Sequence, residues 1–240
     1  AKSLRVIARC GTGLDSVDLL AASRLGIDVF NTPDAPTQAV AELTIAHMLN
    51  SLRHISTTDS NMRSGKWTPT MGSLLATKTV GLIGVGRIGS AVAKLAQAFG
   101  ARVIGFDPVV SSHNSVELLS LDEVLNQADI VSLHVPINDQ THHIVNASAI
   151  SRMKPGSIVI NVSRGGLIDE SALHDALKSQ HLSGAALDCF EDEPYSGPLL
   201  QLPGVHVTAH MGSYARETRD LMEVEASTNL VNGLRKRGLI

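Results

Sequence analysis

The stretch TVGLIGVGRIGSAVAKLAQAFG, residues 79–100, decides how this 240-residue chain is expected to fold. Its first part is an apolar run typical of a buried strand. Its second part places apolar side chains on one face of a helix: Ile88, Val92, Leu95 and Phe99. Gly100 is a typical residue at the end of such a helix. Between strand and helix, Gly84, Gly86 and Gly89 form a GxGxxG pattern.

Each glycine of this pattern has a physical role if the turn binds a dinucleotide. Gly84 permits the tight turn, Gly86 lets the backbone approach a pyrophosphate, and Gly89 lets helix and strand pack closely. The N–H groups and the positive dipole end at the start of the helix favour an anion. Because GxGxxG also occurs in ordinary strand–helix turns, the rest of the sequence has to support this interpretation.

Downstream, apolar runs and helical patterns alternate. Five further strands are expected at residues 102–107, 129–135, 157–162, 184–190 and 205–210. Helices between them are expected to begin at the N-cap residues Ser120, Asn146 and Asp169, with Glu123 completing a capping box. This order predicts an α/β fold with a doubly wound parallel sheet, whose ligands lie at the carboxyl ends of the strands.

Asp107 ends the strand that follows the glycine turn. A carboxylate at this position can accept hydrogen bonds from the adenosine ribose hydroxyls, and it repels a 2′-phosphate. The sequence therefore predicts NAD, rather than NADP, as the cofactor. The alternative for Asp107 is a turn residue in front of Pro108.

Composition argues against several other classes of function. A net charge of −3 and an aromatic content of 3% provide neither a basic nor a stacking surface for nucleic acid. No apolar run reaches the ~20 residues of a membrane helix, and we expect no signal peptide. Cys10 and Cys189 have no metal or CxxC spacing, which favours a reducing, cytoplasmic location. No HExxH, GxSxG or GxxxxGK[ST] motif occurs, so no metal, esterase or NTPase site is expected.

Charged residues follow three of the predicted strands. Arg164 comes after residues 157–162, acidic residues follow residues 184–190, and His210 ends the last strand. A guanidinium can bind a carboxylate with two parallel hydrogen bonds, and a histidine suits proton transfer because its unperturbed pKa is about 6.5. Beside a dinucleotide, this set predicts hydride transfer involving a small anionic substrate. The alternative for Arg164 is a solvated loop charge or an ion-pair partner of Asp169.

The remaining histidines are expected to stand apart from the chemistry. His142 and His143 are adjacent, so they should point apart on any regular element and lie at the surface. His47 falls in a helical stretch with no carboxylate or cysteine at ligand spacing.

Several motifs, taken in order, resemble the D-2-hydroxyacid dehydrogenase family, and within it the phosphoglycerate dehydrogenases. They are RCGTGLDSVDLLAASRLGIDVFNTP (9–33), AVAELT (39–44), GLIGVGRIGSAVAKLAQAFGARVIGFDP (81–108), NVSRGGLIDESAL (161–173), GAALDCFEDEP (184–194) and TAHMGSYARET (208–218). The resemblance implies an NAD-dependent oxidoreductase that transfers a hydride between nicotinamide and a D-2-hydroxy acid or 2-keto acid.

The resemblance also implies roles for the catalytic residues. Arg164 binds the carboxylate and carbonyl oxygen of the substrate. Glu193 pairs with His210, which donates and accepts the proton. Glu191 and Asp192 are then bystanders in a solvated acidic turn.

Ligand-binding residues follow from the same resemblance. Backbone N–H groups of Gly11, Thr12 and Gly13 bind the substrate carboxylate, Asp188 holds the nicotinamide carboxamide, and His134 lines the adenine side. The implied cofactor residues are Gly84, Gly86, Arg87, Ile88, Gly89, Asp107, His134, Val162, Asp188 and Gly212.

Four segments are expected from this comparison. Residues 1–36 are a remnant of a substrate domain whose first half lies upstream, and 37–77 form a linking helix and dimerisation arm. Residues 78–212 form the NAD-binding domain, and 213–240 form a helix returning toward the substrate domain. A homodimer through the cofactor domain is expected; the alternative is that the linking helix only packs on its own domain.

Departures from the family pattern leave the substrate open. TPTMGS, residues 68–73, lacks the basic residue that phosphoglycerate dehydrogenases often carry there, which puts a phosphorylated substrate in doubt. Ala209 and Met211 flank His210 where Pro and Ile or Leu are usual, and these two changes are expected to alter packing but not the chemistry. The alternatives are a glyoxylate or hydroxypyruvate reductase type of enzyme and a non-enzymatic, NAD-sensing module like the corepressors that share this fold.

Overall fold

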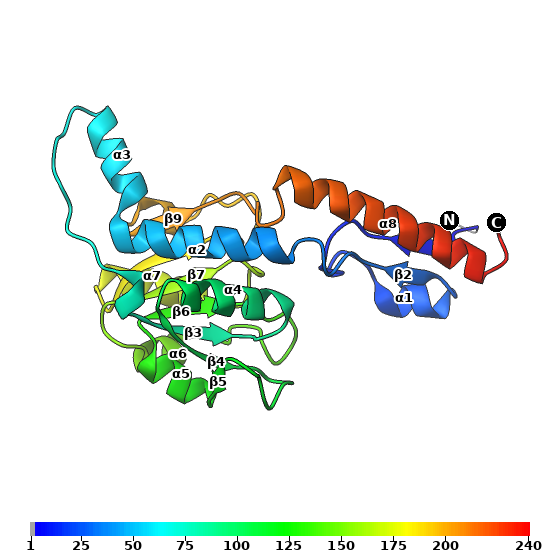
Figure 1. Ribbon diagram of the computed structural model, residues 1–240, viewed down its shortest axis with the longest axis horizontal. Coiled ribbons are helices and arrows are strands. Elements are labelled where there is room, and N and C mark those ends of the chain that lie inside the picture. The colour runs from blue at the N-terminus through cyan, green and yellow to red at the C-terminus, as the bar shows by residue number, and fades with distance from the viewer. Residues whose placement is uncertain (1–2) are drawn as a thin grey trace. The chain divides into compact units, whose positions relative to one another are not determined.

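The computed structural model describes residues 3–240, which divide into two compact units. The first unit contains the chain up to Val40 and from Gly212 onward, and the second contains Ala41–Met211. Figure 1 shows the elements of both. No helix formed by the described residues is long and apolar enough to cross a membrane.

A seven-stranded, fully parallel sheet forms the centre of the second unit, in the order β5-β4-β3-β6-β7-β8-β9. Its strands are β3 (Thr79–Ile83), β4 (Arg102–Phe106), β5 (Glu117–Leu118), β6 (Ile130–Leu133), β7 (Ser157–Asn161), β8 (Leu182–Leu187) and β9 (Val205–Val207). The chain runs outward from β3 to β5 and then returns to β6 on the other side of β3. Ligands of such sheets bind at this reversal point, outside the carboxyl ends of the strands.

The predicted doubly wound parallel sheet is therefore confirmed, and all six predicted strands are present. β5 was not predicted because it is two residues long and pairs only at the edge of the sheet, where its side chains stay exposed or half-buried. A strand this short leaves no apolar run in the sequence.

Helices in the second unit begin where capping chemistry predicts. Ser120 forms a complete capping box with Glu123 at the start of α5 (Leu121–Gln127). The Asn146 side chain accepts a hydrogen bond at the start of α6 (Ala147–Arg152), and that of Asp169 accepts two at the start of α7 (Glu170–Lys178). Two short 3-10 helices, η1 (Leu75–Thr77) and η2 (Pro198–Gln201), complete the connections.

The apolar face of α4 (Arg87–Ala98) differs from the predicted one. Its buried positions are Gly89, Val92, Ala93 and Ala96, whereas Phe99 is 48% exposed and lies beyond the last helical residue. Three of these four positions hold Gly or Ala, and at Gly89 the helix comes so close to β3 that an added Cβ would lie 2.1 Å from the carbonyl oxygen of Gly84. Gly100 ends the helix with a φ of +88°.

A second difference concerns the predicted linking helix. α2 (Thr37–Arg53) ends at Arg53, and a separate helix, α3 (Ile55–Arg63), occupies the start of the expected arm. His54 separates the two with a φ of +53°, a left-handed conformation that breaks the helix. None of the side chains of α3 is buried, so its sequence has no apolar periodicity to detect.

The first unit is a small α/β layer. β1 (Val6–Ala8) and β2 (Asp28–Phe30) pair in parallel, joined by α1 (Leu19–Arg24), whose N-cap is Asp18. The long C-terminal helix α8 (Arg216–Lys236) packs on this pair through Gly233, where an added Cβ would lie 2.8 Å from the Phe30 ring.

We predict that Gly89→Ala destabilises the second unit, because the added Cβ would lie 2.1 Å from the carbonyl oxygen of Gly84. Overpacking of this kind costs about 1–3 kcal/mol in the free energy of unfolding, which urea titration followed by circular dichroism measures. Gly86→Ala is the matched control, since its Cβ meets no atom within 4 Å and its φ is −65°. Unchanged stability of Gly89→Ala would contradict the close contact of helix and strand.

Candidate active site

Six of the residues expected at the site follow the carboxyl ends of six parallel strands. Gly84 follows β3, Asp107 follows β4 and His134 follows β6. Arg164, Asp188 and His210 follow β7, β8 and β9. Because parallel strands end at the same edge, the fold brings these residues to one edge of the second unit.

The glycine turn has the geometry of an anion-binding loop. Gly84 has a φ of +100°, and an added Cβ would lie 2.7 Å from the backbone of His134. Beside Gly86 lies open space, and no side chain caps the first turn of α4, which begins with Arg87 and Ile88. The backbone N–H groups of that turn are therefore available to an anion that reaches Gly86.

Asp107 holds the glycine turn against the end of β4. Its carboxylate accepts hydrogen bonds from the backbone N–H groups of Val85, Val109 and Val110, each at 2.9 Å. Burial alone would raise the pKa of Asp107, but these three N–H groups hold it below its ordinary value. A carboxylate offers about four lone-pair sites, so this one keeps acceptor capacity for a ribose hydroxyl.

His134 lies against the glycine turn from β6. Burial lowers the pKa of its imidazole to about 3, so the ring is neutral at physiological pH. One ring nitrogen, Nε2, pairs with the Ser132 hydroxyl at 2.9 Å, while Nδ1 is buried without a partner among the described residues. An orphaned polar atom beside an open glycine turn fits a bound dinucleotide.

Asp188 is fully buried and held by its neighbours. Its carboxylate accepts the Thr208 hydroxyl at 2.5 Å and the Met211 N–H at 2.8 Å, and its own N–H donates to the carbonyl of Asn161. Val162, also buried, is the residue directly after Asn161, which ends β7. These bonds fix a negative charge between β7, β8 and β9.

Arg164 is half-buried on the loop after β7. Its guanidinium donates to the carbonyl of Ser163 at 2.6 Å, and its own carbonyl accepts the Asn161 side chain at 2.7 Å. The Ser163 hydroxyl donates in turn to the carbonyl of Val135, which ties this loop to the end of β6. The cation is thus placed by the strand ends rather than left on a free loop.

Glu193 and His210 are in direct contact. The Nδ1 atom of His210 lies 2.9 and 3.0 Å from the two carboxylate oxygens of Glu193, and one of those oxygens also accepts the Phe190 N–H. His210 has a φ of +50°, unusual for a residue with a side chain. A carboxylate on Nδ1 fixes the ring orientation and leaves Nε2 as the atom that can exchange a proton.

The Cys189 thiol lies close enough to Asp188, Arg164 and Glu193 for their charges to act on it. Burial is the main cause that raises the pKa of its thiol; Asp188 raises it further, Arg164 lowers it and Glu193 raises it. The charges of both Arg164 and Glu193 therefore act on the thiol, which stays protonated. No cluster of His, Cys, Asp or Glu suited to a metal ion occurs within residues 3–240.

The residues beside the turn that carries Glu193 differ in part from what was expected. His142 is exposed and His143 half-buried, as expected of surface residues, but they lie outside regular structure and do not point apart: their rings stack with centroids 4.0 Å apart, and His143 has a φ of +49°. Glu191 is exposed, as expected of a solvated acidic turn, but it is also bonded: its carboxylate lies 2.5 Å from His143 and its N–H donates to Glu170. These bonds anchor the turn that carries Glu193.

One further histidine was missed. His47 is buried in α2, and its Nε2 lies 3.3 Å from the Thr208 hydroxyl, behind Asp188. Burial lowers the pKa of His47, although Asp188 opposes that shift. His47 and Thr208 are 161 residues apart in the chain, so no spacing in the sequence signals this contact.

The other implied residues belong to the first unit. The N–H of Gly11 donates to the Thr32 hydroxyl at 2.8 Å, so it would have to leave this bond to reach a substrate. Thr12 is exposed and bonded through its carbonyl to Asn31, and Gly13 is half-buried. Gly212 is the residue at which the first unit resumes.

Comparison with known proteins assigns the family. Residues 45–212 match the model of the D-isomer specific 2-hydroxyacid dehydrogenase, NAD binding domain. The chain belongs to this family. The match covers the whole parallel sheet with the glycine turn and the Arg164, Glu193 and His210 set, so the second unit contains the region that matches the NAD-binding domain of this family.

Individual relatives differ in activity. The chain is 43% identical to D-3-phosphoglycerate dehydrogenase of Methanocaldococcus jannaschii over 91% of its own length and 43% of the relative's. It is 42% identical to hydroxypyruvate reductase of Thermotoga maritima, over 93% and 76% of the two lengths. The crystal structure of the TT0316 protein from Thermus thermophilus superposes with a TM-score of 0.93 at 42% identity, covering 98% of this chain and 78% of that one. The chain thus spans less than half of one curated relative and about three quarters of the other.

Within this dehydrogenase domain, we predict that Thr208→Val lowers the free energy of unfolding by about 1–3 kcal/mol. Valine keeps the shape of threonine but removes the O–H that donates to the fully buried Asp188 carboxylate. Chemical denaturation measures the effect. Thr57→Val, at an exposed position of α3, is the control and should change stability little. A loss no larger than that of the control would show that the hydroxyl does not support Asp188.

Proposed function

We propose that this protein is an NAD-dependent oxidoreductase that interconverts a D-2-hydroxy acid and its 2-keto acid. The observation that carries the proposal is the contact of His210 Nδ1 with both oxygens of Glu193, at the strand edge that also carries Arg164. A paired histidine supports proton transfer at the substrate hydroxyl, and a guanidinium supports binding of its carboxylate.

The chain's own residues then have distinct tasks. NAD, when bound, would supply the hydride acceptor for oxidation of the hydroxy acid at C2, and NADH the hydride donor for the reverse reaction. Nε2 of His210 would accept the hydroxyl proton during oxidation and return it during reduction. Glu193 orients the ring through Nδ1 and offsets the positive charge that forms on it. Arg164 holds the carboxylate and carbonyl oxygen of the acid.

NAD rather than NADP is the proposed partner at the adenosine end. Asp107 places a carboxylate beside the glycine turn, and its lowered pKa keeps it charged at physiological pH. A 2′-phosphate would meet this charge directly. Gly86, Arg87 and Ile88 offer the anion-binding turn for the pyrophosphate, and Asp188 the carboxamide contact.

The substrate we propose first is of the phosphoglycerate type, in line with the Methanocaldococcus jannaschii relative. A glyoxylate or hydroxypyruvate reductase is the alternative, in line with the Thermotoga maritima relative. Residues 68–73 lack a basic side chain that could hold a phosphate, which favours the alternative. We further propose that the first unit, with Thr12 and Gly13 on its loop, is part of a substrate domain, and that the protein acts in the cytoplasm.

We predict that the protein binds NADH more tightly than NADPH, and that it reduces at least one of 3-phosphohydroxypyruvate, hydroxypyruvate and glyoxylate. His210→Gln should lower turnover by about 10²–10⁴-fold, and Glu193→Gln by about tenfold or more, with NADH affinity unchanged in both. Fluorescence titration measures binding, and NADH absorbance measures turnover. Asp107→Ser should narrow the preference for NADH.

Each outcome of this experiment separates one alternative from the others. NADH binding without turnover on any of the keto acids would favour the non-enzymatic, NAD-sensing module. Turnover unaffected by His210→Gln would show that another group transfers the proton. Equal affinity for NADH and NADPH would remove the proposed role of Asp107.

A homodimer is proposed from the surface of α3 and the segment that follows it. This arm, residues 55–74, exposes five apolar side chains: Ile55, Met62, Trp67, Met71 and Leu74, with Trp67 83% and Met71 92% exposed. Large apolar side chains this exposed on one short segment mark an interaction site, and a second copy with two-fold symmetry would cover them.

We predict that the double substitution Trp67→Ala and Met71→Ala weakens the dimer about 30-fold or more, because aromatic anchors carry about 2 kcal/mol or more of interface energy. Sedimentation velocity over a dilution series measures the dissociation constant. Phe99→Ala, which removes an exposed ring next to α4 of the same unit, is the matched control. A monomer at micromolar concentration before any substitution would contradict the proposal.

A further inference from the structure

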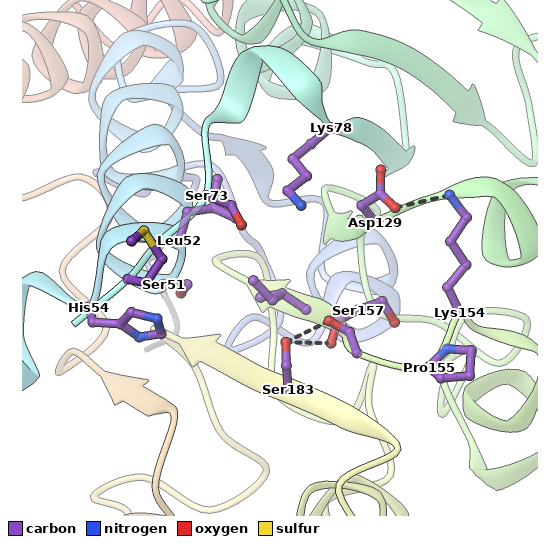
Figure 2. A pocket seen from close by; sticks show the side chains of 14 residues that line it. Ser51, Leu52, His54, Ser73, Lys78, Asp129, Lys154, Pro155, Ser157 and Ser183 are labelled. Atoms are coloured by element: carbon purple, nitrogen blue, oxygen red, sulfur yellow. Dashed lines mark hydrogen bonds and ion pairs between the residues drawn. The ribbon is translucent and has the colours of Figure 1, made fainter.

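A pocket of about 330 Å³ lies at the opposite edge of the same sheet, within the second unit (Figure 2). Lys78, Asp129 and Ser157 stand at the amino ends of β3, β6 and β7. The end of α2, at Ser51 and Leu52, and the segment 71–73 close the other side. This volume is at the lower end of the range for small-molecule sites. The carboxyl ends of these strands carry the dehydrogenase residues, so the pocket is separate from that site.

Two buried hydroxyl groups in the pocket wall lack partners. Ser51 is 6% exposed and Ser157 is 2% exposed, and neither Oγ atom has a hydrogen-bond partner among the described residues. They come from different elements, α2 and β7, yet line one cavity. A buried hydroxyl without a partner is unfavourable. Each of these Oγ atoms exposes less than 1 Å², so a ligand in the cavity would complete its hydrogen bond only once the hydroxyl turns toward the cavity.

Hydrogen bonds and a close backbone contact hold the pocket walls beside Ser51 and Ser157. The N–H of Ser73 donates to the carbonyl of Leu52 at 2.9 Å, and Gly72 is so close to that carbonyl that an added Cβ would lie 2.4 Å from it. On the other side, the Ser183 hydroxyl donates to the carbonyl of Gly156 at 2.6 Å. Hydrogen bonds therefore tie the segment 71–73 to the end of α2 and β8 to the residue before β7.

The charges around the pocket sum to a surplus of one cation. Lys154 is paired with Asp129 at 3.0 Å, and that carboxylate also accepts the N–H of Thr79. Burial opposes ionisation of Asp129, but these partners, together with the charge of Lys78, hold its pKa below the ordinary value. Figure 2 shows the Lys78 ammonium directed toward the space between the lining side chains.

We propose that this pocket binds a small oxyanion, a phosphate or carboxylate group of a small molecule. Lys78 supplies the uncompensated positive charge, Lys154 adds a second ammonium at the rim, and the Ser51 and Ser157 hydroxyls donate hydrogen bonds from the wall. Ammonium and hydroxyl donors together match the several acceptor oxygens of such a group. The proposal does not depend on the dehydrogenase activity.

Isothermal titration calorimetry with inorganic phosphate tests this site, with NADH in excess and ionic strength held constant with sodium chloride. Binding should occur in the unmodified protein, and Lys78→Met should weaken it about tenfold or more. Lys94→Met removes an exposed lysine of α4 outside the pocket and should leave the dissociation constant unchanged. Arg164→Ala should also leave it unchanged, which separates this pocket from the candidate active site. A parallel titration with citrate distinguishes a carboxylate-bearing from a phosphate-bearing ligand.

The variant Ser157→Ala provides an independent test of the proposed anion site. Removing an unpartnered hydroxyl should leave the melting temperature of the ligand-free protein unchanged or higher, while the dissociation constant for phosphate rises about threefold or more. Phosphate heats no larger than those of sodium chloride would show that water alone fills the pocket. Equal binding by Lys78→Met would place the anion elsewhere. If Lys78→Met changes the oligomeric mass of the protein and phosphate does not bind, a second copy of the chain occupies the pocket. Each of these three results overturns the proposal.

Discussion

The contact between the first turn of α4 and the end of β3 is the constraint on which the site depends. A Cβ on Gly89 would lie 2.1 Å from the carbonyl oxygen of Gly84, and one on Gly84 would lie 2.7 Å from the backbone of His134. At the glycine turn, α4, β3 and β6 therefore approach one another through backbone atoms, and Asp107 adds β4 through its bond to the Val85 N–H. Because no side chain intervenes, the N–H groups at the start of α4 stay open to a phosphate while their position is fixed.

Much of this fold follows from local chemistry that a sequence displays. The predicted helix caps are all present: Ser120, Asn146 and Asp169. They could be predicted because a capping bond spans only two or three residues of the chain. Where local signals are weak, prediction failed. β5 is too short for an apolar run, α3 has no buried face, and Phe99 follows a helix whose buried side takes only small residues.

The site was predictable in part, and for a different reason. Arg164, Glu193 and His210 were identified through ordered motifs, and the structure brings Glu193 and His210 into contact over 17 residues of chain. The supporting bonds could not be anticipated. His143 reaches Glu191 across 48 residues and His47 reaches Thr208 across 161, so both contacts exist only after the strands have assembled. Motifs point to the candidate catalytic groups, whereas packing decides what orients them.

Polar groups at the edges of the sheet are of two kinds: those whose hydrogen bonds are made within the fold, and those that are buried without a partner. The Asp188 carboxylate has its donors within the fold, so its position is set before any ligand arrives. The Nδ1 atom of His134 and the hydroxyls of Ser51 and Ser157 are buried without partners among the described residues. Thr37 Oγ1 is a further such atom, for which we have no account. An orphaned donor or acceptor costs stability, and a ligand that completes its hydrogen bond offsets that cost. Such atoms occur beside the glycine turn at one edge and in the lysine-lined pocket at the other, which gives both edges of one sheet the chemistry of a binding site.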